Sequence, residues 1–188
     1  MYQICVSGAA KGDSVEEGRM LALELGKVIA QAGHALLTGA TIGLPNYAAE
    51  GYKLAGGKMS IGISPAASKV EHVMKYRLPI ESYDTILYTG LHYVGRDTLL
   101  ITSSDAVASI GGRLGTLHEF TIAMETDTPI GFLQGAGGIS EEIQTLMSLA
   151  HPLHKDAMIT FNESATELLQ ELTEHLDRTH AKYHDLYA

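Results

Sequence analysis

Short apolar runs alternate with longer amphipathic segments along most of the chain, which predicts strands and helices in turn. The apolar runs predict seven strands, at residues 2–7, 34–38, 58–63, 84–88, 105–110, 129–133 and 157–161. The segments between them predict helices at residues 14–31, 45–55, 95–103, 116–125, 139–149 and 164–180. This alternation favours an α/β fold with a single doubly wound, mainly parallel sheet and helices on both faces. No linker or repeat divides the chain, so residues 1–188 are expected to form one domain.

Several helix ends carry recognisable cap signals. Ser14 and Ser164 are each followed three residues later by a glutamate, which is the spacing of a capping box. Gly33 follows the first predicted helix and Gly56 follows the second, and glycine just past a helix favours a left-handed C-cap. Residues 64–83 show no regular period, and we expect an irregular excursion or lid there.

Composition and charge narrow the classes of partner. The 188 residues are 45% hydrophobic and 19% charged, with a net charge of −9. An acidic chain without a basic cluster is a poor match for nucleic acid or an anionic membrane, so neither is expected as a partner. The single cysteine, Cys5, lies in an apolar run and is expected in the core. No signal peptide or span of ~20 apolar residues is visible, so a cytoplasmic location is expected.

Three glycine-rich loops follow predicted strands, where doubly wound sheets bind their ligands. They read Ser7-Gly8-Ala9-Ala10-Lys11-Gly12, Thr38-Gly39-Ala40-Thr41-Ile42-Gly43 and Gly111-Gly112-Arg113-Leu114-Gly115-Thr116. Each brings small residues to a helix N-terminus, where backbone N–H groups can approach a phosphate. None has the ending of a Walker loop, and none has the spacing and acidic residue expected of a pyridine-nucleotide dehydrogenase. A tight turn without a ligand is the alternative interpretation of each loop.

The most specific pattern joins Arg96, Asp105 and the segment from Gly111 to Glu119. Arg96 precedes Asp105 by nine residues, and the strand that begins there runs directly into the glycine segment. The pattern resembles the LOG-like family, Rossmann-type proteins long mislabelled lysine decarboxylases, whose hallmark is Pro-Gly-Gly-x-Gly-Thr-x-x-Glu. Gly111 stands at the proline and Arg113 at the second glycine. The sequence therefore looks closer to uncharacterised bacterial and archaeal branches and to molybdenum cofactor carriers.

The resemblance implies a nucleotide-binding protein that hydrolyses the N-glycosidic bond of a nucleoside 5′-monophosphate to base and ribose 5-phosphate. It implies that Arg96 and Glu119 are catalytic, because a carboxylate can stabilise a positively charged sugar or activate water. The phosphate- and nucleotide-binding residues that we expect are Ser7, Gly8, Gly39, Gly43, Gly112, Arg113, Gly115 and Thr116. Since the family commonly dimerises, we also expect a homodimer or a higher homo-oligomer.

Several alternatives stay open. The altered loop also fits a non-catalytic binder or carrier of a nucleotide or of a molybdenum cofactor-type phosphate ligand. Thr116 and Glu119 have capping-box spacing, which gives Glu119 a structural alternative. Tyr83, Tyr88 and Tyr93 fit either a base pocket or the core. The histidines show no close pairing, so no metal site and no cofactor are expected.

Overall fold

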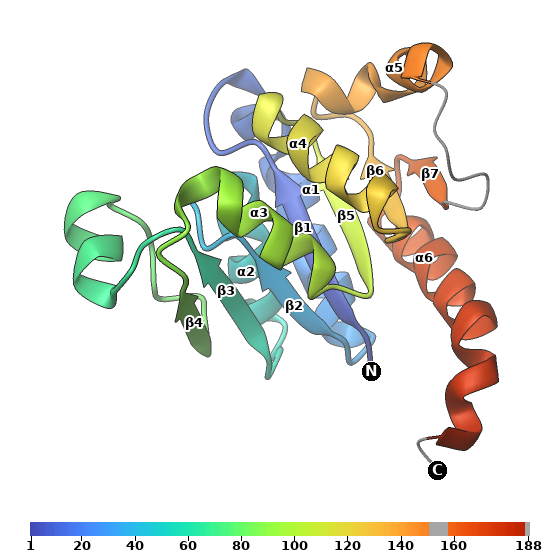
Figure 1. The fold of residues 1–188 in the computed structure, drawn as a ribbon, viewed down its shortest axis with the longest axis horizontal. Helices are drawn as coiled ribbons and strands as arrows, with labels where there is room; N and C mark the ends of the chain where they lie inside the picture. Colours follow the sequence, from blue (N-terminus) through green and yellow to red (C-terminus); the bar gives the residue numbers. More distant parts are fainter. Residues whose placement is uncertain (151–157, 187–188) are drawn as a thin grey trace.

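The computed structural model describes residues 1–150 and 158–186 (Figure 1). Its strands are β1 (Gln3–Gly8), β2 (Ala35–Thr38), β3 (Ser60–Ser64), β4 (Thr85–Tyr88), β5 (Ala106–Ile110), β6 (Ile130–Leu133) and β7 (Ile159–Asn162). Its α-helices are α1 (Asp13–Gln31), α2 (Leu44–Leu54), α3 (His92–Thr102), α4 (Leu114–Glu125), α5 (Ile143–Ala150) and α6 (Ala165–His180). Every predicted strand and helix is present with bounds shifted by a few residues, although Ala157 lies outside the described residues.

The strands form one parallel sheet in the order β4-β3-β2-β1-β5-β6-β7. The chain builds outward from β1 to β4 and then returns to place β5 on the other side of β1. The strand order therefore reverses between β1 and β5, where Ser7 lies opposite Ser109 in the register. In an open α/β sheet this reversal leaves a crevice beyond the carboxyl ends of the two strands.

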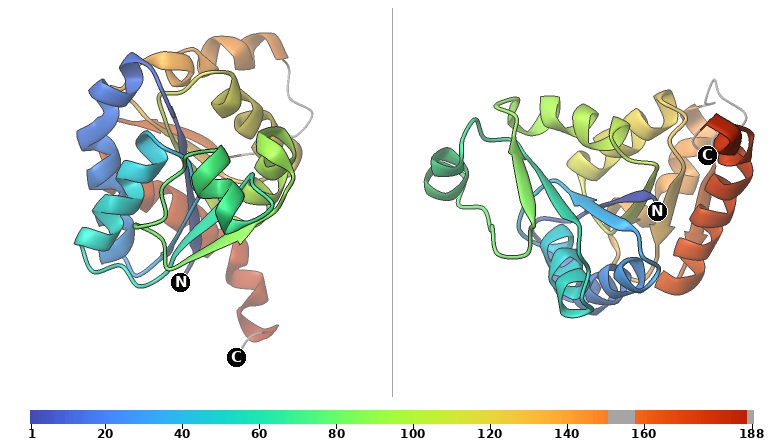
Figure 2. Two further views of the ribbon diagram at one scale, coloured as in Figure 1. Left: turned by 90° about the vertical axis from the view of Figure 1, so that its left-hand side faces the viewer. Right: turned by 90° about the horizontal axis from the view of Figure 1, so that it is seen from below.

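Helices cover both faces of the sheet, as predicted (Figure 2). One core cluster packs α1, α2 and α6 on one face, around side chains such as Leu25, Leu36 and Leu168. The other lies beneath α3, α4 and α5 and includes Cys5 and Phe132. Cys5 is fully buried, and this burial raises the pKa of its thiol, which fits the predicted core role. Among the described helices, none is long and apolar enough to cross a membrane.

Glycines end the first two helices as their positions predicted. Gly33 has φ +74°, its N–H donates to Ala30 O, and the N–H of His34 donates to Ile29 O, which is the Schellman pattern. Ser164 Oγ accepts the N–H of Glu167 and caps α6 as expected. The capping box predicted at Ser14 is wrong, because α1 begins one residue earlier and its N-cap is Gly12. Ser14 thus lies inside the first turn.

The excursion predicted at residues 64–83 contains a π-helical turn, Glu71–Lys75. His72 lies in this turn, and its side chain is fully buried. His72 Nε2 donates to Pro79 O at 3.0 Å, so Nδ1 is left to accept the hydroxyl of Ser64 at 2.8 Å. Both ring nitrogens of His72 are thereby satisfied, and the excursion is tied to the end of β3.

Candidate functional site

A pocket of about 220 Å³ lies at the carboxyl ends of β1 and β5, where the strand order reverses. Its lining comes from the loops that enter α1, α2 and α4 and from the N-terminal half of α3. Figure 1 labels these four helices. Its lining residues are Val6, Ser7, Gly8, Ala9, Ala10, Gly39, Thr41, Pro45, Tyr93, Arg96, Asp97, Arg113, Gly115, Thr116 and Glu119. Elements far apart in the sequence thus converge where the topology predicts a ligand site.

The structure brings together eight of the ten predicted site residues. Those that line the pocket are Ser7, Gly8, Gly39, Arg96, Arg113, Gly115, Thr116 and Glu119. Gly43 and Gly112 are not among its lining residues, and their contact with a ligand stays a prediction. A Cβ at Gly43 would strike the carbonyl of Ala9, and one at Gly112 would strike the side chain of Thr116. Both glycines permit close packing of the loops behind the pocket.

The loop before α4 has a backbone that only glycine adopts readily. Gly111 has φ +57° and Gly112 has φ +98°. Proline is held near φ −65°, so it does not fit the observed conformation of Gly111. The departure from the Pro-Gly-Gly motif therefore belongs to a different local path of the chain. Arg113 follows as the N-cap residue of α4, with its exposed side chain at the pocket.

Arg96 is the buried cation of the pocket. It lies in the second turn of α3, which begins at His92 and not at Gly95 as predicted. The side chain is only 4% exposed, and its guanidinium lies against Gly39, where a Cβ would overlap it. Among the described residues, neither Nε nor Nη1 of Arg96 has a hydrogen-bond partner. A buried donor without a hydrogen-bond partner costs about 1–3 kcal/mol or more, and Nη1 has only the longer contacts to the carboxyl groups of Asp97 and Glu119.

Glu119 is a buried carboxyl group on the opposite wall. It projects from α4, and its Oε2 accepts the hydroxyl proton of Ser7 at the end of β1. Its Oε1 lies 3.9 Å from Arg96 Nη1. Burial and then the negative charge of Asp97 raise the pKa of Glu119 to about 7, although Arg96 and the Ser7 hydrogen bond act in the opposite direction.

The capping interpretation of Glu119 does not fit this geometry. α4 begins at Leu114 with Arg113 as its N-cap, so Thr116 already lies within the first turn. No side-chain cap hydrogen bond occurs at that N-cap, and the carboxylate of Glu119 points to Ser7 instead. Thr116 is 3% exposed and lines the pocket.

Asp97 is a site residue that the sequence reasoning missed. It is 5% exposed, with Oδ1 3.6 Å from Arg96 Nη1 and Oδ2 3.0 Å from His118 Nδ1. His118 is partly exposed and lies next to Glu119 in α4. The sequence did hold a signal for it. An acidic residue directly follows Arg96 and a histidine directly precedes Glu119, so each of the two helices carries one further ionisable group beside a predicted site residue.

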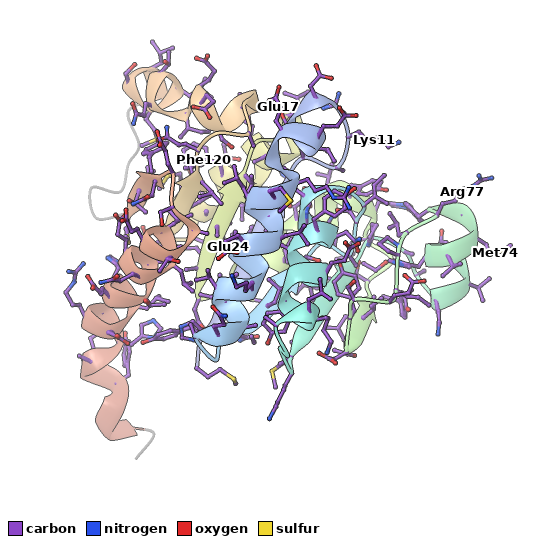
Figure 3. All side chains as sticks on the ribbon, turned by 180° about the vertical axis from the view of Figure 1, so that it is seen from behind. Lys11, Glu17, Glu24, Met74, Arg77 and Phe120 are labelled. Carbon is purple, nitrogen blue, oxygen red and sulfur yellow. The ribbon has the colours of Figure 1, made fainter. Side chains whose placement is uncertain are left out.

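The remaining candidate residues differ in whether they line the pocket. Tyr93 lines the pocket, whereas Tyr83 lies behind it with its hydroxyl 2.9 Å from Thr38 Oγ1. Lys11 is exposed, and its side chain extends away from the molecule beyond the loop that enters α1 (Figure 3). The described residues contain no group of three or more His, Cys, Asp or Glu side chains that could hold a metal ion.

The fold is that of a Rossmann-like α/β protein, and its pocket lies at the reversal of strand order. The profile of the SLOG cluster4 family matches residues 1–169, and the chain belongs to this family. An uncharacterized protein from Archaeoglobus fulgidus is 31% identical over 134 residues, which cover 71% of this chain and 81% of that protein.

Two solved structures of molybdenum cofactor proteins are similar to the chain. The molybdenum cofactor binding protein from Rippkaea orientalis is 27% identical, with a TM-score of 0.71 over 93% of this chain and 96% of that chain. The molybdenum cofactor carrier protein from Chlamydomonas reinhardtii is 28% identical, with a TM-score of 0.73 over 92% and 96%. The predicted resemblance is thus confirmed as far as a LOG-related SLOG family and a likeness to cofactor carriers.

Proposed function

We propose that this protein binds a phosphorylated small molecule, of nucleotide or molybdenum cofactor type, and holds it without turning it over. The observation that carries the proposal is Arg96, whose buried Nε and Nη1 have no hydrogen-bond partner among the described residues. Phosphate oxygens are strong acceptors that suit a guanidinium. The pocket wall that contains Arg96 also contains Gly39, whose lack of a side chain leaves room for the guanidinium.

The phosphate itself has a second source of attraction at the start of α4. Gly115 and Thr116 lie in its first turn and line the pocket, and the helix N-terminus carries partial positive charge. Arg113 adds a full positive charge at the rim. These groups act locally, so a chain with a net charge of −9 can still bind an anion. Pro45 brings the start of α2 to the other side of the same pocket.

Relatives support the carrier reading over hydrolysis. The similar proteins from Rippkaea orientalis and Chlamydomonas reinhardtii are a cofactor binding protein and a cofactor carrier. The molybdenum cofactor would be cargo in this pocket, with its phosphate toward α4 and Arg96. We propose that the protein acts in the cytoplasm, where nucleotides and such cofactors occur.

Hydrolysis of a nucleoside 5′-monophosphate is the second candidate, and Glu119 favours it. A buried carboxyl group with a pKa of about 7 can exchange protons at neutral pH. In this reaction Glu119 takes a proton from a water molecule while the oxygen of that water bonds to C1′ of the ribose. The C1′–N bond breaks, and its electron pair leaves with the base. Arg96 would hold the phosphate or a ribose oxygen.

One experiment separates binding, turnover and neither. The protein is titrated by calorimetry with a panel of nucleoside 5′-monophosphates and with purified molybdenum cofactor, and free base is followed by chromatography. Carriage predicts saturable binding of a panel member without free base, lost in Arg96→Met and kept in the exposed control Lys11→Met. Free base that disappears in Glu119→Gln would establish the hydrolase instead. Absence of binding to the whole panel would overturn both.

A further inference from the structure

The pocket wall carries more negative than positive charge where it is most buried. Arg96 supplies one cation, while Asp97 and Glu119 supply two carboxyl groups on either side of it. All three side chains are at least about nine-tenths buried. If both carboxyl groups are ionised, this part of the site carries one net negative charge and repels an incoming phosphate.

The groups that face Glu119 come from three elements. Asp97 and Arg96 face it from α3, His118 from α4, and the thiol of Cys5 from β1. Burial and the charge of Asp97 raise the pKa of Glu119 to about 7, and a bound anion nearby raises it further because like charges disfavour ionisation. Glu119 is therefore the group of this cluster whose charge responds to the ligand in the neutral range.

We infer that binding of a phosphate-type anion is accompanied by uptake of one proton at Glu119, and that Asp97 is the positioning residue that makes this uptake necessary. The inference deepens the proposed function and rests on it. The proton comes from solvent, and it goes to Oε1 because Oε2 already accepts the hydroxyl of Ser7. Once Glu119 is neutral, Arg96 balances Asp97 and no net negative charge opposes the ligand.

Asp97 lines the pocket, and the role inferred for it here depends on its contacts with His118 and Arg96. Its Oδ2 is held 3.0 Å from His118 Nδ1, and its Oδ1 lies 3.6 Å from Arg96 Nη1. These contacts fix a negative charge beside Glu119 whether or not the pocket is filled. The His118 side chain that holds Asp97 is itself partly exposed.

Calorimetry with inorganic sulfate tests the inference directly. Sulfate resembles phosphate but stays a dianion throughout the neutral range, so any proton taken up belongs to the protein. Titrations in two buffers with different ionisation enthalpies give the number of protons bound per sulfate. We expect roughly half a proton just above pH 7, because Glu119 is already partly protonated there, and an affinity that falls on the order of tenfold in total as the pH rises through that range.

Variants separate this inference from the proposed function. Glu119→Gln should bind sulfate with no proton uptake and no such pH dependence, and Asp97→Asn should reduce the uptake while sulfate still binds. Glu125→Gln, an exposed carboxylate on the same helix, is the control and should behave like the parent. Binding by the parent without proton uptake would overturn the inference and leave the binding site standing. Absence of binding of sulfate, nucleotide and molybdenum cofactor at every pH would overturn the proposed function itself.

Discussion

The guanidinium of Arg96 occupies the space that a side chain at residue 39 would need, so Gly39 and Arg96 form one unit of the pocket wall. Gly39 does not have a positive φ, and its requirement for glycine is therefore steric. A glycine at the end of β2 and an arginine in α3 lie 57 positions apart in the sequence, and the sheet brings them together.

Gly39→Ala should displace the Arg96 side chain and weaken binding of a nucleoside monophosphate at least about tenfold, because the guanidinium loses its place in the wall. Calorimetry measures the affinity, and thermal unfolding measures the accompanying loss of stability. The matched control is Gly95→Ala in α3, the helix that contains Arg96. A Cβ at Gly95 would meet only Leu91 at 3.2 Å. Equal affinities for the two variants would show that Arg96 does not hold the ligand.

Gly115→Ala tests ligand approach without a folding defect. A Cβ at Gly115 would have open space around it, and the residue lies in the first turn of α4 on the pocket. We expect the variant to be as stable as the parent, or more stable by up to about 1 kcal/mol, since alanine favours helix. Its affinity for the ligand should nevertheless fall roughly tenfold, because the methyl group takes space beside the phosphate. Unchanged affinity would remove this turn from the ligand site.

Gly111→Pro restores the motif of the LOG-like family but should destabilise this protein. Proline does not adopt the φ of +57° observed at Gly111, so the change should cost about 3 kcal/mol. Chemical denaturation gives the free energy of unfolding. A variant of unchanged stability would mean that the loop takes the path of the Pro-Gly-Gly motif after all.

Stability should depend on pH through Glu119. Its pKa rises from 4.5 to about 7 on folding, so between these values the folded state binds a proton that the unfolded state has lost. The unfolding free energy then falls as the pH rises through this window, by up to about 3 kcal/mol. Glu119→Gln should be more stable than the parent above pH 7 and should show a flatter pH profile. A parent whose stability rises over the same window would contradict the assigned burial of Glu119.

The periodicity of the chain was sufficient to predict the alternating elements, because strands buried on both faces read as short apolar runs. The convergence of the three glycine loops could also be predicted, since parallel strands end at one edge of the sheet. That Gly43 and Gly112 lie outside the pocket lining could not be predicted, because a glycine that packs a loop and one that lines a pocket look alike in sequence. Asp97 was missed because its role depends on contacts with His118 and Arg96. The homo-oligomer expected from the resemblance stays a prediction.

We propose that the pocket recognises a phosphate through Arg96. The most direct measurement is a calorimetric titration of the parent and of Arg96→Met with the best-bound nucleoside 5′-monophosphate and with the matching nucleoside. We predict that the parent prefers the monophosphate by at least about tenfold, and that Arg96→Met loses most of this preference because only the start of α4 and Arg113 still attract the phosphate. A parent that binds both equally well, or an Arg96→Met variant that keeps the preference, would contradict the account.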